Sequence, residues 1–156
     1  MGEKEKEFDK EAGAVLGWRL SRDSRASLNK GGSLVNIEYV QVNGTDIAVV
    51  SGDQAEIGTP QAALELAMTV KYEAGAERVA IDKEALGEDF FILSTGAAGE
   101  ILQKFVNYHV KAAVFGDYSR YTSKPLRDFI HESNKGRHFF FAATREEALE
   151  RLSQTN

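Results

Sequence analysis

Two short segments of this sequence carry side chains suited to binding an anion or accepting a phosphoryl group. The first is Ser94-Thr95-Gly96, which opens an expected helix that also contains Gly99. Free backbone N–H groups and the helix dipole make a helix N-terminus favourable for an anion or a phosphorylated hydroxyl, and the added charge can switch a docking surface. The simpler alternative is that Ser94 or Thr95 only caps the helix. Gly96 and Gly99 would allow close approach of a ligand, a partner or the sheet, and tight packing of the helix against the sheet is the favoured reason.

The second segment is a polar loop that follows an expected buried strand. Its side chains are rich in hydroxyl groups and include a carboxylate and an amine: Asp117, Tyr118, Ser119, Tyr121, Thr122, Ser123 and Lys124. In open α/β sheets, ligands bind at the carboxyl ends of the strands, where this loop lies. The loop that leads to Ser94 follows the preceding strand, so we expect the two segments to converge into one polar surface. The alternative is an exposed loop that only caps the next helix.

The residue types and motifs argue against several other kinds of site. The absence of cysteine excludes a disulfide framework, a thiolate zinc site, an iron–sulfur cluster and a cysteine nucleophile. The histidines are not spaced as paired ligands on a helix: His109, His131 and His138. Neither a Gly-x-Ser-x-Gly elbow nor a dinucleotide or Walker-type glycine loop occurs. The sequence therefore predicts no catalytic residue, no bound metal and no cofactor, and it favours a binding or regulatory protein over an enzyme.

Length and composition narrow the class of protein. The chain has 156 residues, of which 42% are hydrophobic, and it carries a net charge of −5, which suits one domain with a packed core. The acidic balance argues against a dedicated nucleic-acid binder, because such a protein carries a basic excess. No apolar run approaches the roughly 20 residues of a membrane span, and no signal peptide is recognisable. We therefore expect a cytoplasmic protein that binds neither nucleic acid nor membrane.

The first 34 residues differ in composition from the remainder. Residues 1–11 are a mixed-charge run, typical of a solvated helix or a terminus, and residues 21–34 are rich in small and polar residues, which predicts a linker. We place a boundary near Val35, between an N-terminal extension (1–34) and one domain (35–156). Codons for the Lys-Gly-Gly stretch before Val35 can resemble a ribosome-binding site, so one hypothesis is an extension that lies outside the fold. The alternative is an ordinary basic tail or an added helix.

From Val35 onward, strand and helix patterns alternate. Asn43-Gly44 predicts a hairpin turn between the first two strands, because both residues tolerate positive φ. Strands are predicted over residues 36–42, 46–51, 78–82, 111–116 and 139–143, and helices start at Thr59, at Ser94–Gly96, at Thr122 or Ser123, and at Thr144. The order ββαβαβαβα predicts an α/β fold with a mixed sheet whose later strands are parallel.

Two longer stretches resemble a known family. One runs from Asp89 to Tyr108 and includes Ser94-Thr95-Gly96, and the other runs from Gly116 through Lys124 to Gly136. Together they resemble the bacterial Domain of Unknown Function 4180 family, over about residues 35–152. The family name implies no activity.

The element order is also similar to the STAS fold of anti-sigma factor antagonists, which implies a STAS-like architecture. In those proteins a phosphorylatable Ser or Thr precedes Gly at the start of the helix after the third strand, and Leu93-Ser94-Thr95-Gly96 occupies that place. Leu93 replaces the acidic residue that usually precedes the Ser/Thr pair, and this departure puts recognition by a kinase partner in doubt. Similarity of fold does not establish function.

Two functional interpretations follow. The first is a non-enzymatic regulatory or protein-interaction module, which binds a protein partner or accepts a phosphoryl group at the helix start Ser94–Gly96. The alternative is a small-molecule-binding protein or enzyme whose site is the 117–124 loop. A concave cavity on the order of several hundred Å³ at this place would favour the second interpretation, and a flat surface would favour the first. An apolar helix face left uncovered would also allow a homodimer.

Overall fold

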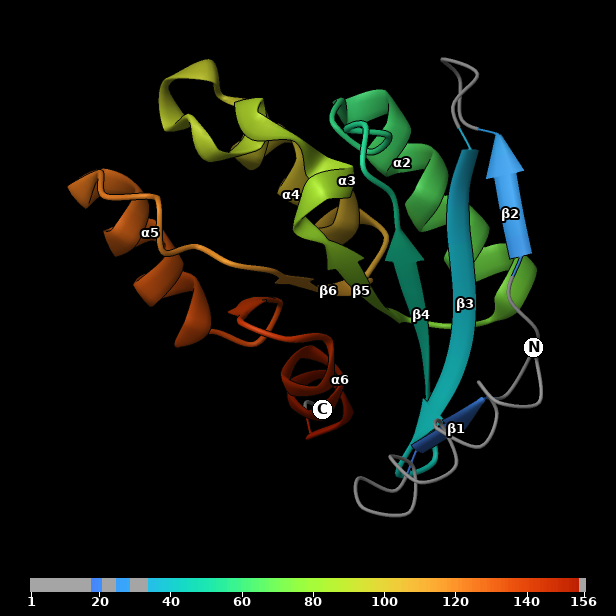
Figure 1. Cartoon of the computed structure of the whole chain (residues 1–156). Coiled ribbons are helices and arrows are strands. Elements are labelled where there is room, and N and C mark those ends of the chain that lie inside the picture. The colour runs from blue at the N-terminus through green and yellow to red at the C-terminus, as the bar shows by residue number, and fades with distance from the viewer. Residues whose placement is uncertain (1–17, 21–24, 29–33, 155–156) are drawn as a thin grey trace.

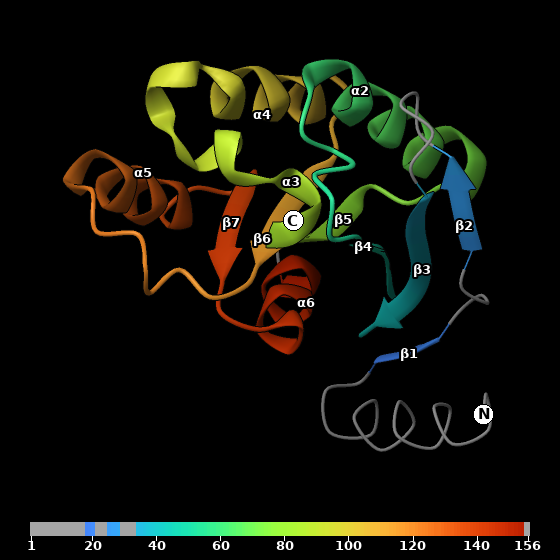
Figure 2. The ribbon, with the colours of Figure 1, turned by 45° about the horizontal axis from the view of Figure 1, so that its top comes forward.

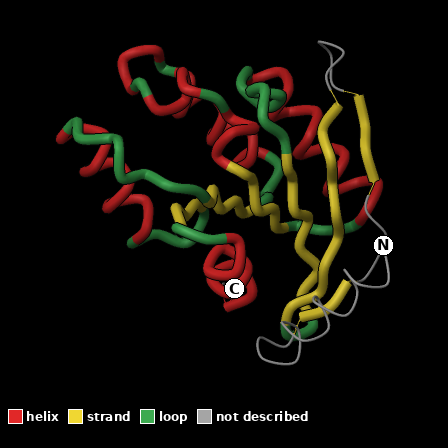
Figure 3. Tube along the Cα trace, viewed as in Figure 1, coloured by secondary structure: helices red, strands yellow, loops and turns green. Residues whose placement is uncertain are grey.

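One sheet forms the centre of the molecule. The computed structural model describes residues 18–20, 25–28 and 34–154. Within these residues seven strands form a single sheet in the order β1-β3-β4-β5-β6-β7, and β2 also pairs with β3. Figure 3 shows these strands in yellow and the surrounding helices in red. The fold is therefore mixed α/β, as the sequence predicts.

The first half of the sheet is antiparallel. β3 (Leu34–Val42) and β4 (Thr45–Ser51) form a hairpin whose register pairs Val42 with Thr45. The turn is Asn43-Gly44, with φ angles of 52° and 83°. The positive φ values confirm the hairpin turn that the Asn-Gly pair predicts.

The second half of the sheet is parallel and carries most of the core. β5 (Arg78–Asp82), β6 (Lys111–Phe115) and β7 (Phe139–Ala142) follow β4, each parallel to its neighbour. Their central residues are buried, as expected for parallel strands covered on both faces. All four parallel strands end at one edge of the sheet, which we call the carboxyl edge, and begin at the opposite, amino edge.

Helices cover both faces of this sheet (Figures 1 and 2). Val79 and Ile81 belong to the core on one face, while Ala80 between them belongs to the core on the other. The second face is covered by α6 (Arg145–Gln154), whose Leu149 is fully buried. The first face is covered by α2 (Pro60–Met68), its continuation η1 (Thr69–Glu73), α4 (Ala97–Asn107) and α5 (Lys124–Asn134).

Capping residues start three of these helices where the sequence predicts them. Thr59 accepts a hydrogen bond from the Ala62 N–H ahead of α2, and Ser123 accepts one from Leu126 ahead of α5. Thr144 accepts the Glu147 N–H ahead of α6. From β3 onward the order ββαβαβαβα is confirmed, with three short helices inserted between β5 and α4: α3 (Lys83–Leu86), η2 (Glu88–Phe91) and η3 (Leu93–Thr95). The STAS-like architecture stays a prediction.

Two short strands precede the hairpin. β1 (Trp18–Leu20) and β2 (Arg25–Leu28) both pair antiparallel with β3. The structure therefore differs from the predicted linker over residues 21–34, because part of that segment pairs with the sheet. The mixed-charge run over residues 1–11 lies outside the described residues, and the division into an extension and a domain starting at Val35 stays a prediction.

Candidate functional site

Long connections meet at the carboxyl edge of the sheet. The connections after β4, β5 and β6 span residues 52–59, 83–96 and 116–123, and those after β4 and β6 are drawn largely in green in Figure 3. The first connection is fixed to the second by backbone hydrogen bonds, from Ala55 N–H to the Glu84 carbonyl at 3.1 Å and from Ile57 N–H to the Ala85 carbonyl at 2.7 Å. This edge is where ligands bind in open α/β sheets.

A buried lysine lies at the centre of this edge. Lys83 directly follows β5 and is only 5% exposed. The register of β5 and β6 pairs Asp82 with Phe115, which places Lys83 beside Gly116. A Cβ atom on Gly116 would lie 2.7 Å from the Lys83 Cβ. Glycine at this position therefore makes room for the lysine stem.

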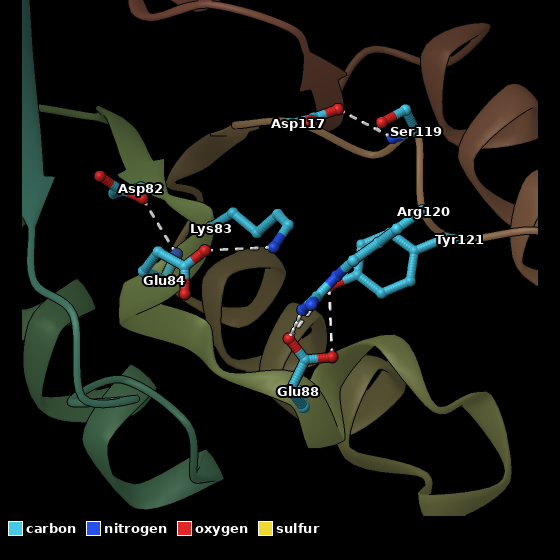
Figure 4. A network of polar contacts seen from close by, with 8 residues as sticks. All are labelled: Asp82, Lys83, Glu84, Glu88, Asp117, Ser119, Arg120 and Tyr121. Atoms are coloured by element: carbon cyan, nitrogen blue, oxygen red, sulfur yellow. Dashed lines mark hydrogen bonds and ion pairs between the residues drawn. The ribbon is translucent and has the colours of Figure 1, made fainter.

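Two aromatic rings and one carboxylate surround the Lys83 ammonium, and Figure 4 shows the carboxylate of Glu84 and the ring of Tyr121. The lysine Nζ atom lies 3.3 Å from Glu84 Oε2, 5.1 Å from the centroid of the Tyr121 ring and 5.6 Å from that of Phe91. Burial alone would lower the pKa of Lys83, but the Tyr121 phenol and the Glu84 carboxylate favour the charged form and raise the pKa overall. Lys83 is therefore a fixed positive charge at neutral pH.

Glu88 ties the 117–124 loop to η2. Its carboxylate forms an ion pair with Arg120 and accepts a hydrogen bond from the Tyr121 hydroxyl at 3.3 Å (Figure 4). The Arg120 guanidinium lies 5.2 Å from the Tyr121 ring centroid, and the Tyr121 ring stacks on Phe91 at 5.0 Å. These contacts hold the loop in one position against the connection that follows β5.

Two residues of the loop are committed to fixing its shape. The Asp117 carboxylate accepts the Ser119 backbone N–H at 2.9 Å, and this hydrogen bond lowers the pKa of Asp117. The Tyr118 hydroxyl donates to the Val114 carbonyl at 2.6 Å. Burial raises the pKa of Tyr118, so its phenol stays protonated and acts as a wall of the site rather than as an acid or base.

A groove of about 450 Å³ opens between this loop and α5. We call it the carboxyl-edge groove. None of the described residues that line it carries a carboxylate. They include two tyrosines, a serine, a threonine, an arginine and a histidine: Tyr118, Ser119, Tyr121, Thr122, Arg127, Ile130, His131 and Asn134. Within the described part of the chain, the Arg127 guanidinium takes part in none of the ion pairs, while the neighbouring Lys124 pairs with Asp128 at 2.8 Å.

The helix start at Ser94–Gly96 is exposed and is built by Thr95. The Thr95 hydroxyl donates toward the Asp89 and Ile92 carbonyls at 2.9 and 2.8 Å, and its oxygen accepts the Ala97 N–H at 3.1 Å. Thr95 therefore stabilises the turn that leads into α4, while the N-cap position itself is Gly96, which has no side chain to cap the helix. The hydrogen bonds of the Thr95 hydroxyl all lie within residues 89–97. The contacts of this connection with the 117–124 loop that are described above come from Lys83 and from η2.

The two glycines of this segment have a different role from the one expected. A Cβ atom on Gly96 or Gly99 would meet nothing within 4 Å. The expectation that they permit close packing against the sheet is therefore wrong. Gly96 has a φ of 79°, which places it in the left-handed region that favours glycine ahead of a helix. Gly99 is exposed on α4 and nothing in the structure requires a glycine there.

The predicted loop residues divide into two groups. Tyr118, Ser119, Tyr121 and Thr122 line the groove. The remaining three serve local structure, since Asp117 fixes the turn, Ser123 caps α5 and Lys124 pairs along that helix. The structure adds residues that the sequence analysis did not select: Lys83, Glu88, Arg120, Arg127 and His131. The i, i+4 spacing of Arg127 and His131, directly after the polar loop, is the signal that points to the last two.

The described residues contain neither a cluster of metal ligands nor a helix that could cross a membrane. Within residues 18–20, 25–28 and 34–154, no three histidine, aspartate or glutamate side chains are grouped so that they could hold a metal ion. None of the helices in that part of the chain has both the length and the apolar character needed to cross a membrane.

Comparison with known protein families gives a match to most of the chain. The family model of the Domain of unknown function (DUF4180) matches residues 42–152, a range that runs from the end of β3 into α6 and includes the whole carboxyl edge. A search of curated proteins and a search of solved structures found no match. Because the family model covers most of the chain, the protein belongs to the DUF4180 family.

Proposed function

We propose that this protein binds a small aromatic anion, a carboxylate or phosphate attached to a ring, in the carboxyl-edge groove. The observation that carries the proposal is the groove itself. It has a volume of about 450 Å³, within the range typical of small-molecule sites. It combines tyrosine side chains with the Arg127 guanidinium, and none of the described residues lining it is acidic.

The lining suggests how such a ligand is held. A guanidinium can donate two parallel hydrogen bonds to a carboxylate or phosphate, so Arg127 binds the anionic group. The hydroxyls of Ser119 and Thr122 lie along the same groove and supply further donors. The rings of Tyr118 and Tyr121 offer faces and edges for an aromatic ring of the ligand. The contacts of Glu88 with Arg120 and Tyr121 support this wall before the ligand arrives.

A regulatory module that uses Ser94–Gly96 is the second candidate. It is favoured by the exposure of all three residues ahead of α4. In that function Ser94 or Thr95 accepts a phosphoryl group, and a protein partner recognises the change in charge. Phosphorylation of Thr95 would replace a hydroxyl that already makes hydrogen bonds to Asp89 and Ile92. Ser94 is therefore the better acceptor of the two.

Calorimetric titration tests the first candidate. The probes are phenyl phosphate, inorganic phosphate and phenol, each added to the full chain. We expect phenyl phosphate to bind most tightly, because of the three probes only it has both a phosphate for the Arg127 guanidinium and a ring for Tyr118 and Tyr121. Arg127→Gln should weaken binding about tenfold or more, since a hydrogen bond to a charged group contributes roughly 1.5–3 kcal/mol.

The matched control is Lys135→Gln, which removes the same charge from an exposed residue just after α5 and outside the groove. It should bind phenyl phosphate as the unmodified chain does. Equal losses in both variants would show only a general effect of net charge, and equal affinities for phenyl phosphate and inorganic phosphate would remove the role of the rings. Either result would contradict the proposal.

A further inference from the structure

One face of α5 forms a wall of the carboxyl-edge groove. The α5 residues that line the groove are three or four positions apart, so they form a single stripe along the helix: Arg127, Ile130, His131 and Asn134. At the rise of an α-helix, Arg127 and Asn134 are separated by about 10 Å along the axis. The groove therefore extends well beyond the guanidinium and has a second end at Asn134.

The amide of Asn134 is oriented by the edge strand of the sheet. α5 lies beside β7, the last strand in the sheet order (Figure 2), and Asn134 Oδ1 accepts the Phe141 backbone N–H at 2.7 Å. The backbone carbonyl of Asn134 accepts a hydrogen bond from the Arg151 guanidinium at 2.8 Å, which ties the end of α5 to α6. Because the Phe141 N–H requires the amide oxygen, the Nδ2 group is fixed as a donor. In the described part of the chain no group accepts a hydrogen bond from this Nδ2 group, so it is free for a ligand.

The part of the groove between its two ends suits a flat apolar group. Ile130 lies on the α5 stripe between them, and the ring of Tyr118 belongs to the wall formed by the 117–124 loop. Tyr118 is held in place, since its hydroxyl donates to the Val114 carbonyl and its ring packs edge-on against Phe141, with 5.7 Å between the ring centroids. The groove therefore offers a cation, an apolar middle and a fixed amide donor, in that order along α5.

We propose that the carboxyl-edge groove selects aromatic anions that carry a carbonyl group on the side of the ring remote from the anion, and that Asn134 binds this carbonyl. The inference rests on the proposed function, because it takes the anion to be bound by Arg127. The carbonyl oxygen accepts a hydrogen bond from Asn134 Nδ2, and the ring lies against Ile130 and Tyr118. A ligand of the same shape without the carbonyl leaves the half-buried amide without a partner, and this penalty provides the selectivity.

Calorimetric titration of the full chain with three aryl phosphates tests this inference. The probes are phenyl phosphate, 4-acetylphenyl phosphate and 4-isopropylphenyl phosphate. The two substituents have nearly the same shape, and only the acetyl group has a carbonyl. We expect 4-acetylphenyl phosphate to bind several-fold more tightly than 4-isopropylphenyl phosphate, because only the acetyl compound satisfies the Asn134 amide.

One variant removes the donor and keeps the bond that supports the fold. Asn134→Asp leaves an oxygen for the Phe141 N–H. Its negative charge should weaken the binding of all three probes, and the preference for the acetyl compound over the isopropyl compound should disappear. The matched control is Asn107→Asp at the end of α4, outside the groove lining, where the new carboxylate can still accept the Gln103 amide. This control should keep the preference.

The role of Asn134 and the proposed function fail in different ways. Equal affinities of the unmodified chain for the two substituted probes would overturn the role of Asn134, while binding of phenyl phosphate would leave the proposed function intact. A preference that survives Asn134→Asp, or one that is also lost in Asn107→Asp, would overturn the role of Asn134 as well. Absence of binding by all three probes would overturn both proposals.

Discussion

The two edges of the parallel sheet are built in different ways. The carboxyl edge uses long connections over residues 52–59, 83–96 and 116–123, and the second of these carries the three short helices α3, η2 and η3. The amino edge uses short turns over residues 74–77, 108–110 and 135–138. At the carboxyl edge, side chains such as Thr95 and Asp117 fix the loops by hydrogen bonding to nearby backbone groups. At the amino edge, backbone groups close the turns, as in the bond from Ala76 N–H to the Val70 carbonyl at 3.0 Å.

The two edges also differ in the groups that surround a buried or half-buried lysine. The buried Lys83 at the carboxyl edge has a carboxylate and two aromatic rings around it, and its pKa is raised. The half-buried Lys111 at the amino edge has two arginines near it, and its pKa is lowered. The groups around Lys83 therefore favour its charged form, whereas burial and the two arginines near Lys111 disfavour the charged form of that residue.

The largest loss of stability is expected when a methyl group is added at the carboxyl edge. Gly116→Ala places a Cβ atom 2.7 Å from the Lys83 stem, so the lysine or the backbone must move. We expect the free energy of unfolding to fall by about 2–4 kcal/mol, from overpacking and backbone strain together. Urea denaturation measures the loss.

Gly75→Ala is the matched change at the amino edge. Gly75 has a φ of 71°, but a Cβ atom there meets nothing within 4 Å. Only conformational strain opposes the alanine, so the loss should be about 1 kcal/mol. Equal losses at the two glycines would show that Lys83 is not held tightly beside Gly116.

A smaller effect is expected from the hydroxyl that builds the start of α4. Thr95→Ala removes the hydrogen bonds to Asp89, Ile92 and Ala97. Because the residue is exposed, we expect a loss of about 1 kcal/mol, typical of a lost cap. Thr95→Ser keeps the hydroxyl and should recover most of this loss in urea denaturation. If both variants are as stable as the unmodified chain, Thr95 has no structural role, and the phosphoacceptor interpretation gains weight.

The smallest expected changes in the free energy of unfolding come from two lysine variants, and these changes have opposite signs. Lys83→Met should lower the free energy of unfolding at pH 7, because it removes a cation that its surroundings favour. Lys111→Met should raise the free energy of unfolding, because it removes a cation that burial, Arg78 and Arg137 disfavour. Parallel urea titrations of the two variants give the signs. Two losses, or two gains, would contradict the contrast between the edges.

The pH dependence of these variants follows from the direction of each pKa shift. The folded-state pKa of Lys83 lies above the usual 10.5, so its stabilising contribution is complete below pH 10.5 and is lost as the pH rises through the folded pKa. The folded-state pKa of Lys111 lies below 10.5, so its cost is present below that pKa and is relieved as the pH rises through it. The stability advantage of Lys111→Met should therefore shrink in alkaline solution.

Local signals in the sequence predict most of the fold. The Asn43-Gly44 turn and the caps Thr59, Ser123 and Thr144 lie where their chemistry requires them, because each acts through its immediate neighbours. The order of strands and helices follows from apolar runs bounded by such signals. The role expected of Gly96 and Gly99 is wrong because packing depends on residues distant in the sequence.

The site could be predicted only in part for the same reason. The polar character of the 117–124 loop is visible in the sequence, and four of its residues line the groove. The burial of Lys83 depends on the register between β5 and β6, which brings Gly116 beside it. The contact of Glu88 with Arg120 joins residues 32 positions apart. Neither relation has a signal in any short window of the sequence.

The most direct test of the central claim is a titration of the full chain with phenyl phosphate, followed through the histidine ring signals. His131 lines the carboxyl-edge groove, and His109 and His138 lie at the opposite edge. Binding of the aromatic anion in the carboxyl-edge groove predicts a saturable shift of the His131 signal while the other two stay in place. An unmoved His131 signal, or equal shifts of all three, would contradict the account.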